Sequence, residues 1–190
     1  MSANLTVTAN SLNTARLNLS PFALSDADEL FLIRGDSEAM RYWDWPADKS
    51  RMGTLVVARE MLHDASTGAA KIWTARLGDG AFVGVVDLSA IMAHEADLGF
   101  MIRRDYWGRG YAFGAAMLAI LNAKALGMAR LKARIHADNL RSRKLLERLG
   151  FAAGETRDME IRPGVAKRCQ FFALENLAAR FDQGSSSLSQ

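Results

Sequence analysis

The sequence predicts a single α/β domain, in which a series of antiparallel strands leads into one strand–loop–helix unit. Three observations support this prediction. A chain of 190 residues is long enough to bury a substantial core in one domain. Its hydrophobic content of 49% and charged content of 24% are those of a folded globular protein. Segments with strand periodicity alternate along the chain with segments of helical periodicity.

The first half of the chain predicts one strand, two helices and then three consecutive strands. Apolar and polar residues alternate over 14–20, as in a half-buried strand. Ser25 is a candidate N-cap for a helix through Arg34, and a second helix is expected over about 51–64. Glycines and polar residues then separate three expected strands, at 71–77, 82–91 and 96–103.

The second half predicts two helices and two strands. An alanine-rich helix from Arg109 to Leu126 should end at Gly127, a C-cap glycine. The remaining elements are expected at 130–137 (strand), 140–149 (helix) and 166–174 (strand). No linker divides the chain, so we expect one domain at 14–182 between flexible tails at 1–13 and 183–190.

The composition excludes several classes of protein. Cys169 is the only cysteine, which excludes an intrachain disulfide and a cysteine-rich zinc site. The three histidines lack the spacing of metal ligands, so no metal is expected. No run approaches the ~18 apolar residues of a membrane span, and the N-terminus does not resemble a secretory signal. We therefore expect a cytoplasmic protein without a membrane partner, as a monomer or a homodimer.

Positive charge is concentrated in one part of the chain. Residues 1–102 carry 8 basic and 13 acidic side chains, a net charge of −5. Residues 103–148 carry 11 basic and 3 acidic side chains, a net charge of +8, and residues 149–190 carry 5 of each. A short positive block in a nearly neutral protein indicates a local anionic partner rather than a general affinity for nucleic acid.

The sharpest motif lies where this positive block begins, between a predicted strand and the long helix. It reads Arg103-Arg104-Asp105-Tyr106-Trp107-Gly108-Arg109-Gly110-Tyr111-Ala112. Glycines allow successive backbone N–H groups to point into one concavity, and a helix start adds positive potential, which together suit a pyrophosphate. The motif is neither a Walker loop nor a dinucleotide fingerprint. A glycine turn that only starts a helix is the alternative.

A second motif covers residues 139–151 and reads Asn139-Leu140-Arg141-Ser142-Arg143-Lys144-Leu145-Leu146-Glu147-Arg148-Leu149-Gly150-Phe151. Its leucines form one apolar face of a helix, and Asn139 could be no more than the N-cap. Together the two motifs resemble the GNAT N-acetyltransferase superfamily, in its branch of ribosomal-protein N-terminal acetyltransferases (RimJ/RimL type). Trp107 replaces the Gln/Arg that leads the family's loop motif, although Tyr-Trp-Gly-Lys/Arg-Gly-Tyr-Ala is usual in this branch.

The resemblance covers about residues 14–175 and implies the GNAT fold, with a mixed, mostly antiparallel sheet of about six to seven strands flanked by helices. It also implies acetyl-CoA as co-substrate. In the family, the pantetheine arm runs beside one strand, a loop cradles the pyrophosphate, and an asparagine contacts the arm. The matching positions are Phe100, Met101, Ile102, Gly108, Arg109, Gly110, Tyr111, Ala112, Phe113 and Asn139. Arg143 or Lys144 could approach the phosphates, or be solvated helix charges.

The expected reaction is direct acetyl transfer to an amine, which must lose a proton before it attacks the thioester. Where some members have a carboxylate and a tyrosine, this chain has Arg134 and Leu146, so those roles are not carried over. The candidate bases are Asp97 first, then Glu95, with Asp87 as a third option or a contact of the substrate. Ser142 is the candidate proton donor to the leaving thiolate. Each could instead be structural.

The candidate residues for binding the acceptor amine are Tyr42, Trp43 and Trp45. They occupy positions where the family builds part of its acceptor pocket. The acidic balance of residues 1–102 suits a cationic acceptor, either a small-molecule amine or a protein N-terminus. Two other functions stay open at this point. One is a non-catalytic acyl-CoA sensor on the same fold. The other is a nucleic-acid binder, which no recognition motif supports, so no nucleic-acid partner is expected.

Overall fold

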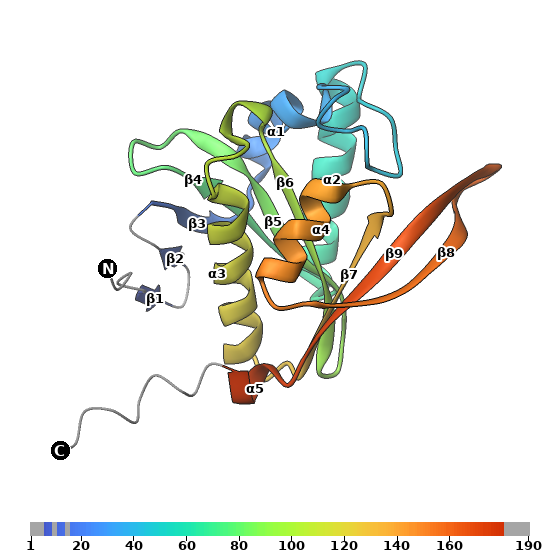
Figure 1. Cartoon of the computed structure of the whole chain (residues 1–190). Helices are drawn as coiled ribbons and strands as arrows, with labels where there is room; N and C mark the ends of the chain where they lie inside the picture. Colours follow the sequence, from blue (N-terminus) through green and yellow to red (C-terminus); the bar gives the residue numbers. More distant parts are fainter. Residues whose placement is uncertain (1–5, 9–10, 14–15, 181–190) are drawn as a thin grey trace.

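The computed structural model describes residues 6–8, 11–13 and 16–180, and nine strands in this part of the chain form one sheet. The strand order is β1-β2-β3-β4-β5-β6-β7-β9-β8, and every neighbouring pair is antiparallel except β6 and β7. The strands are β1 (Thr6–Thr8), β2 (Ser11–Asn13), β3 (Asn18–Pro21), β4 (Lys71–Arg76), β5 (Phe82–Met92), β6 (Glu95–Ile102), β7 (Arg130–His136), β8 (Ala152–Arg162) and β9 (Val165–Glu175). The expected mixed, mostly antiparallel sheet is confirmed (Figure 1).

Helices cover both faces of this sheet (Figure 1). They are α1 (Ala27–Arg34), α2 (Arg51–Thr67), α3 (Tyr111–Ala125), α4 (Leu140–Arg148) and the short α5 (Leu177–Arg180). Val86 and Leu88 of β5 belong to the core beneath α3 and α4, whereas Val85 belongs to the core beneath α1 and α2. This alternation follows from the period of two in a strand. None of the helices in the described ranges is long and apolar enough to cross a membrane.

Local sequence explains how the helices begin and pack. Ser50 caps α2 by accepting a hydrogen bond from the N–H of Gly53. The helix expected from Ser25 begins later, at Ala27, because residues 24–26 form a 3-10 turn in which Asp26 accepts from the N–H of Ala23. Helix α3 buries small alanines against the sheet, so its backbone lies close to the strands.

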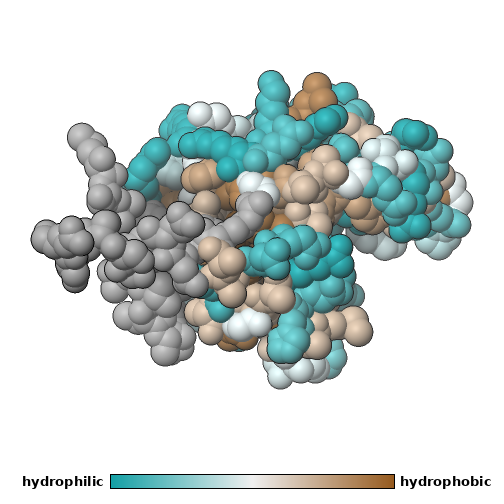
Figure 2. All heavy atoms as spheres, turned by 60° about the horizontal axis from the view of Figure 1, so that its bottom comes forward, coloured by the Kyte–Doolittle hydropathy of each residue, from teal (hydrophilic) through white to brown (hydrophobic). Residues whose placement is uncertain are grey.

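Two parts of the sheet were not predicted. Strands β1 and β2 lie within residues 1–13, where the sequence predicts a tail, and the expected tail at 183–190 lies outside the described residues. Strand β8 escapes prediction because most of its side chains are exposed, so its sequence has no alternation of apolar and polar residues. It forms a long hairpin with β9 that projects from the body, and Figure 2 shows hydrophilic side chains gathered on this projection.

The sheet has an opening near its centre, where the parallel strands β6 and β7 diverge. The two strands pair only at residues 95–97 and 130–132 and are unpaired beyond these positions. Strand β6 stays paired with β5 as far as Ile102, and β7 stays paired with β9 as far as His136. The backbone edges that face the opening are therefore available to a ligand, and the loops that carry the two motifs follow these strands.

Candidate functional site

Two adjoining cavities lie at this opening. The larger has a volume of about 690 Å³ and extends from the start of α3 to the end of α1. The smaller, of about 260 Å³, lies between the diverging ends of β6 and β7. Five residues line both cavities, namely Tyr42, Trp43, Phe100, Asn139 and Ser142. The residues that the sequence singled out for three different roles therefore meet at one junction.

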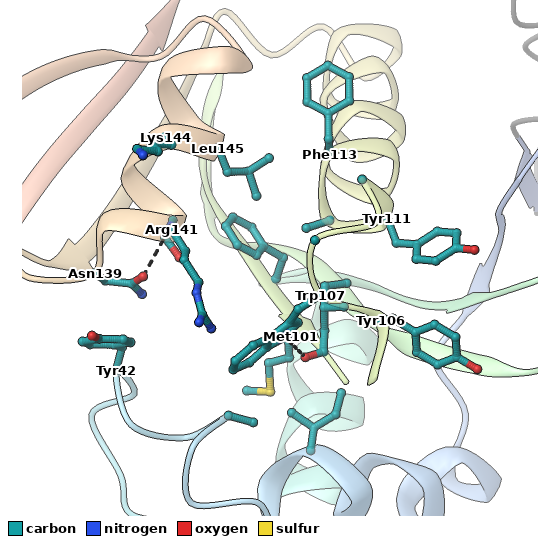
Figure 3. A pocket seen from close by; sticks show the side chains of 18 of the residues that line it. Tyr42, Met101, Tyr106, Trp107, Tyr111, Phe113, Asn139, Arg141, Lys144 and Leu145 are labelled. Atoms are coloured by element: carbon teal, nitrogen blue, oxygen red, sulfur yellow. Dashed lines mark hydrogen bonds between the residues drawn. The ribbon is translucent and has the colours of Figure 1, made fainter. Parts of the chain in front are cut away.

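The start of α3 forms one wall of the larger cavity. Gly108 and Gly110 have φ angles of 73° and 81°, a left-handed conformation that favours glycine. No side chain caps α3, and the first N–H groups of a helix have no partner within the helix, so those of residues 111–113 can bind an anion. The indole N–H of Trp107 donates to the carbonyl of Ile102 at 2.7 Å, which fixes the loop on β6 (Figure 3).

Basic side chains of α4 form the opposite wall (Figure 3). Arg141, Lys144 and Arg148 line the larger cavity because their spacing of three and four residues places them on one helix face. The guanidinium of Arg141 lies 4.7 Å from the ring centre of Trp107, and that of Arg148 lies 4.1 Å from the ring centre of Phe113. These contacts hold two cations beside the start of α3.

Two of the residues expected near the phosphates, Arg109 and Arg143, do not line the larger cavity. Arg143 does not line the cavity, because its position in α4 turns it away, and its Nε bonds Oε1 of Glu147 at 3.0 Å. Arg109 does not line it either: its guanidinium stacks on Tyr106 and its carbonyl accepts from Arg16. The other expected residues of this group do line the larger cavity, namely Phe100, Met101, Ile102, Gly108, Gly110, Tyr111, Ala112, Phe113 and Asn139.

Asn139 is both an N-cap and a lining residue of the two cavities. Its side-chain oxygen accepts a hydrogen bond from the N–H of Ser142 at 3.1 Å, so it is the N-cap of α4. It also lines both cavities, as does Ser142. The cap therefore holds the start of α4 at the opening between β6 and β7.

Two carboxylates occupy the smaller cavity on one face of the sheet. Asp87 of β5 is paired in register with Gly99 of β6, and Ser89 is paired with Asp97, so these four side-chain positions share a face. Burial raises the pKa of Asp87 to about 6, a hydrogen bond from Ser89 partly offsets this, and the charge of Asp97 adds to it. A carboxyl group with such a pKa can hold or release a proton near neutral pH.

A glycine makes room for the carboxylate of Asp87. A β-carbon at Gly99 would overlap with Oδ1 of Asp87, and Gly99 does not have a left-handed backbone that would itself require glycine. Asp97 lies beside the pair: its Oδ1 is 3.7 Å from Nζ of Lys132 and has no hydrogen-bond partner. Both carboxylates therefore line the cavity, and Asp97 is also ion-paired with Lys132.

Glu95, the second candidate base, lines neither cavity. It lies at the start of β6, where the strands are still paired, and its Oε1 is 2.7 Å from Nζ of Lys132. Mainly because of this hydrogen bond, the pKa of Glu95 lies below its usual value. Glu95 is thus part of a surface ion-pair network that also includes Arg130.

The loop between α1 and α2 closes the smaller cavity. Tyr42 and Trp43 line it as expected, but Trp45 does not: its side chain is 59% exposed and stacks on Arg162 of β8. Asp44, which lies between the two tryptophans in the sequence, forms an ion pair with Arg134 of β7 and a hydrogen bond with the ring of His136 of the same strand. Burial alone would raise the pKa of Asp44, but the hydrogen bonds and charges of Arg134 and His136 outweigh it and lower the pKa.

Several lining residues were missed by the sequence interpretation. A helical wheel would have found Arg141 and Arg148, because both lie on the face of Leu145. Asp44 and His136 gave no such signal, since a contact across 92 residues depends on the tertiary fold. Within the described residues, no group of three or more His, Cys, Asp and Glu side chains could hold a metal ion.

The site fits the parts of coenzyme A. Free N–H groups and cations surround the place for phosphates, and the open edge of β6 offers backbone groups to an extended arm. Apolar side chains of β6 and α4 lie between these two regions. This arrangement can bind a long ligand that is anionic at one end, with its other end at the junction of the two cavities.

Comparisons with known proteins agree with this site. Residues 16–152 match the acetyltransferase (GNAT) domain family. An uncharacterized N-acetyltransferase p20 of Bacillus licheniformis is 29% identical over 157 residues, or 78% of this chain and 86% of that protein. RimL, the ribosomal L7/L12 alpha-N-protein acetyltransferase solved with coenzyme A, has a TM-score of 0.77 and 19% identity, over 86% of this chain and 96% of that one.

A third similar protein is spermidine N-acetyltransferase from Vibrio cholerae, solved with CoA and spermine. Its TM-score is 0.73 at 17% identity, over 84% of this chain and 95% of that one. At such identities the solved structures establish the fold, and the family match over most of the chain establishes membership. The chain belongs to the GNAT family of acetyltransferases, as its two motifs predicted.

Proposed function

We propose that this protein transfers the acetyl group of acetyl-CoA directly to a primary amine. The observation that carries the proposal is the junction of the two cavities. A cavity with free helix N–H groups and cations meets a cavity with two carboxylates, and Phe100, Asn139 and Ser142 line both. A thioester at this junction would lie within reach of an amine held beside the carboxylates.

The start of α3 and the basic face of α4 would hold the phosphates of acetyl-CoA, and the edge of β6 at residues 100–102 would hold the pantetheine arm. The bound thioester supplies an activated acyl group. Asn139 would contact the arm near its reactive end. A backbone N–H near Phe100 would stabilise the negative charge that develops on the thioester oxygen during attack.

The carboxylates of the smaller cavity would handle the proton of the amine. We assign the base to Asp87, since its pKa of about 6 leaves it ionised at neutral pH and lets it accept a proton without a large penalty. Asp97, which the sequence favoured, would raise the pKa of Asp87 through its charge and attract the cationic amine. Ser142 would donate a proton to the leaving thiolate.

The charges of the smaller cavity support a cationic acceptor. Asp87 and Asp97 line the cavity, and the cation that also lines it, Arg134, is paired with Asp44. Lys132, which is ion-paired with Asp97, does not line the cavity. The two named neighbours differ in their acceptors: one is an acetyltransferase of the ribosomal protein L7/L12, and the other is a spermidine acetyltransferase solved with spermine. We therefore propose a small-molecule polyamine or a protein N-terminus as the acceptor, without a preference between them.

The test is a panel of amines and peptides with acetyl-CoA, in which release of the thiol measures turnover. We expect turnover with cationic amines, a loss of ~100-fold in Asp87→Asn, and a smaller loss in Asp97→Asn, with acetyl-CoA affinity near wild type in both. A preference for neutral or anionic acceptors would contradict the proposed acceptor class. Tight acetyl-CoA binding without turnover on any amine would instead indicate a sensor.

A further inference from the structure

We propose that Asp44 is a positioning residue for the acceptor. Through its ion pair with Arg134 and its hydrogen bond with His136, it holds the loop between α1 and α2 (residues 35–50) on β7, so that Tyr42 and Trp43 form the wall shared by the two cavities. The consequence for acceptor binding rests on the proposed function, but the contact itself does not.

The contacts of Asp44 reach across the molecule. Its Oδ2 lies 2.5 Å from Nη2 of Arg134 and its Oδ1 lies 3.2 Å from Nη1, a bidentate pair. Oδ1 also lies 3.3 Å from Nε2 of His136, which is buried. Tyr42 completes the cluster by packing edge-on against the His136 ring, with the ring centres 6.4 Å apart. One carboxylate thus joins the loop to two residues of the same strand.

The two ends of this loop are held by other residues. Near its start, Asp36 pairs with Arg104 at 3.0 Å. Near its end, Asp48 pairs with the buried Arg34 and accepts a hydrogen bond from Thr54 at 2.6 Å. Asp44 lies between these anchors, directly beside Tyr42 and Trp43. Its loss should therefore loosen the middle of the loop without releasing its ends.

Asp44 also neutralises the guanidinium of Arg134, which lines the smaller cavity. Arg134 and His136 line the smaller cavity together with Asp87 and Asp97. Without Asp44, the guanidinium of Arg134 would face a cationic amine without compensation. Without Arg134, Asp44 would add a carboxylate to the cavity. Substituting Asp44 and substituting Arg134 therefore distinguish positioning from simple electrostatics. If the role is purely electrostatic, the two substitutions should change the affinity for a cationic amine in opposite directions. If Asp44 positions the loop, both substitutions should weaken amine binding.

The experiment compares Asp44→Asn, Arg134→Met and the double variant, using the amine from the panel that has the highest kcat/KM. We expect each single variant to raise the KM for this amine about 10-fold or more, with kcat within about threefold and the acetyl-CoA Kd within about twofold. The double variant should be no worse than either single variant, because both remove one interaction. A lower KM in Arg134→Met, or additive losses, would overturn the proposal.

Hydrogen–deuterium exchange gives a readout that does not depend on turnover. Peptides covering residues 41–46 should exchange faster in Asp44→Asn, while those covering residues 51–67 of α2 stay protected. Unchanged exchange at 41–46 would rule out the positioning role even if activity falls. If no amine is acetylated by the wild type, faster exchange still supports the contact and only the proposed function fails. Asp158→Asn, which removes an ion pair with Arg168 on the β8–β9 hairpin, is the control.

Discussion

The two cavities are built in different ways. The wall that would hold phosphates comes from one continuous piece of chain, residues 100–113, together with one face of α4. The smaller cavity is assembled from the loop after α1 and from β5, β6 and β7, whose residues lie far apart in the sequence. One wall presents cations and free N–H groups, and the other presents carboxylates.

This difference matters for how each region tolerates change. Backbone N–H groups bind an anion whatever the neighbouring side chains are, provided that the glycines keep their conformation. The chemistry of the smaller cavity depends instead on individual side chains and on the distances between them. Variants of the first region should therefore affect acetyl-CoA binding, and variants of the second should affect turnover or the acceptor.

The largest effect is expected for Gly110→Val. A β-branched residue is strained at a φ of 81°, so the start of α3, which we propose binds the phosphates, should be distorted. We expect acetyl-CoA binding to fall at least ~100-fold by calorimetry. Gly164→Val is the matched control, because Gly164 has a φ of 73° at the tip of the β8–β9 hairpin, away from both cavities. Equal losses in the two variants would refute the loop assignment.

Asp87→Asn should remove turnover while leaving acetyl-CoA affinity intact. The loss expected for a missing general base is ~100-fold or more in kcat. In the wild type, kcat should fall as the pH drops through about 6, since protonated Asp87 cannot accept the proton of the amine. A pH profile with the same inflection near 6 in Asp87→Asn would exclude Asp87 as the titrating group.

The same variant should be more stable than the wild type at pH 7. The pKa of Asp87 is higher in the folded state than its usual 3.8, so the folded state binds the proton more tightly than the unfolded state does. The free energy of unfolding of the wild type therefore decreases as the pH rises from about 4 to 6. Asparagine resembles the protonated form and avoids this loss, which is worth up to about 3 kcal/mol at pH 7. Urea unfolding at pH 7 and pH 4 measures it; the advantage should vanish at pH 4.

A smaller effect is expected for Gly99→Ala. The added methyl would displace the carboxylate of Asp87 without removing it, so kcat should fall about 10-fold, less than the ~100-fold or more expected when a general base is lost. Gly53→Ala is the control, because its β-carbon would meet Asp48 at an ordinary 3.7 Å. If Gly99→Ala retains full turnover with an unchanged pH profile, the position of Asp87 is not critical.

The smallest effects belong to the basic face of α4. Arg141→Ala and Arg148→Ala should each weaken acetyl-CoA binding about fivefold at low salt, in line with ~1 kcal/mol for a partly screened charge pair. Arg143→Ala, on the other side of the helix, should leave it unchanged because that guanidinium pairs with Glu147. Titrations at two salt concentrations measure this. An equal loss in Arg143→Ala would mean that the whole helix attracts the ligand nonspecifically.

Most of the fold was predictable because its elements follow local rules. The helix at α2 begins at the expected residue, and the long alanine-rich helix is displaced by only two residues at its start. Strand β8 was not predictable, because an exposed strand that is held by hydrogen bonds to its partner's backbone has no hydrophobic pattern of its own. At the site, Glu95 and Asp97 are two residues apart, and the sequence ranked Asp97 before Glu95 as a candidate base. The pairing of β6 with β7 separates them, because Glu95 falls in the paired part and Asp97 at its end.

The sequence by itself was enough to predict the side that we propose binds the phosphates, because a glycine loop followed by an uncapped helix is a local structure that needs few distant contacts. It also determined the family and the uneven charge, with +8 in residues 103–148. Only the tertiary structure decided which carboxylates line the smaller cavity. Asp87 has its pKa because it is buried beside Asp97 over Gly99, and Asp44 meets Arg134 because the loop after α1 lies on β7. Burial and contact across the sheet are properties of the assembled fold.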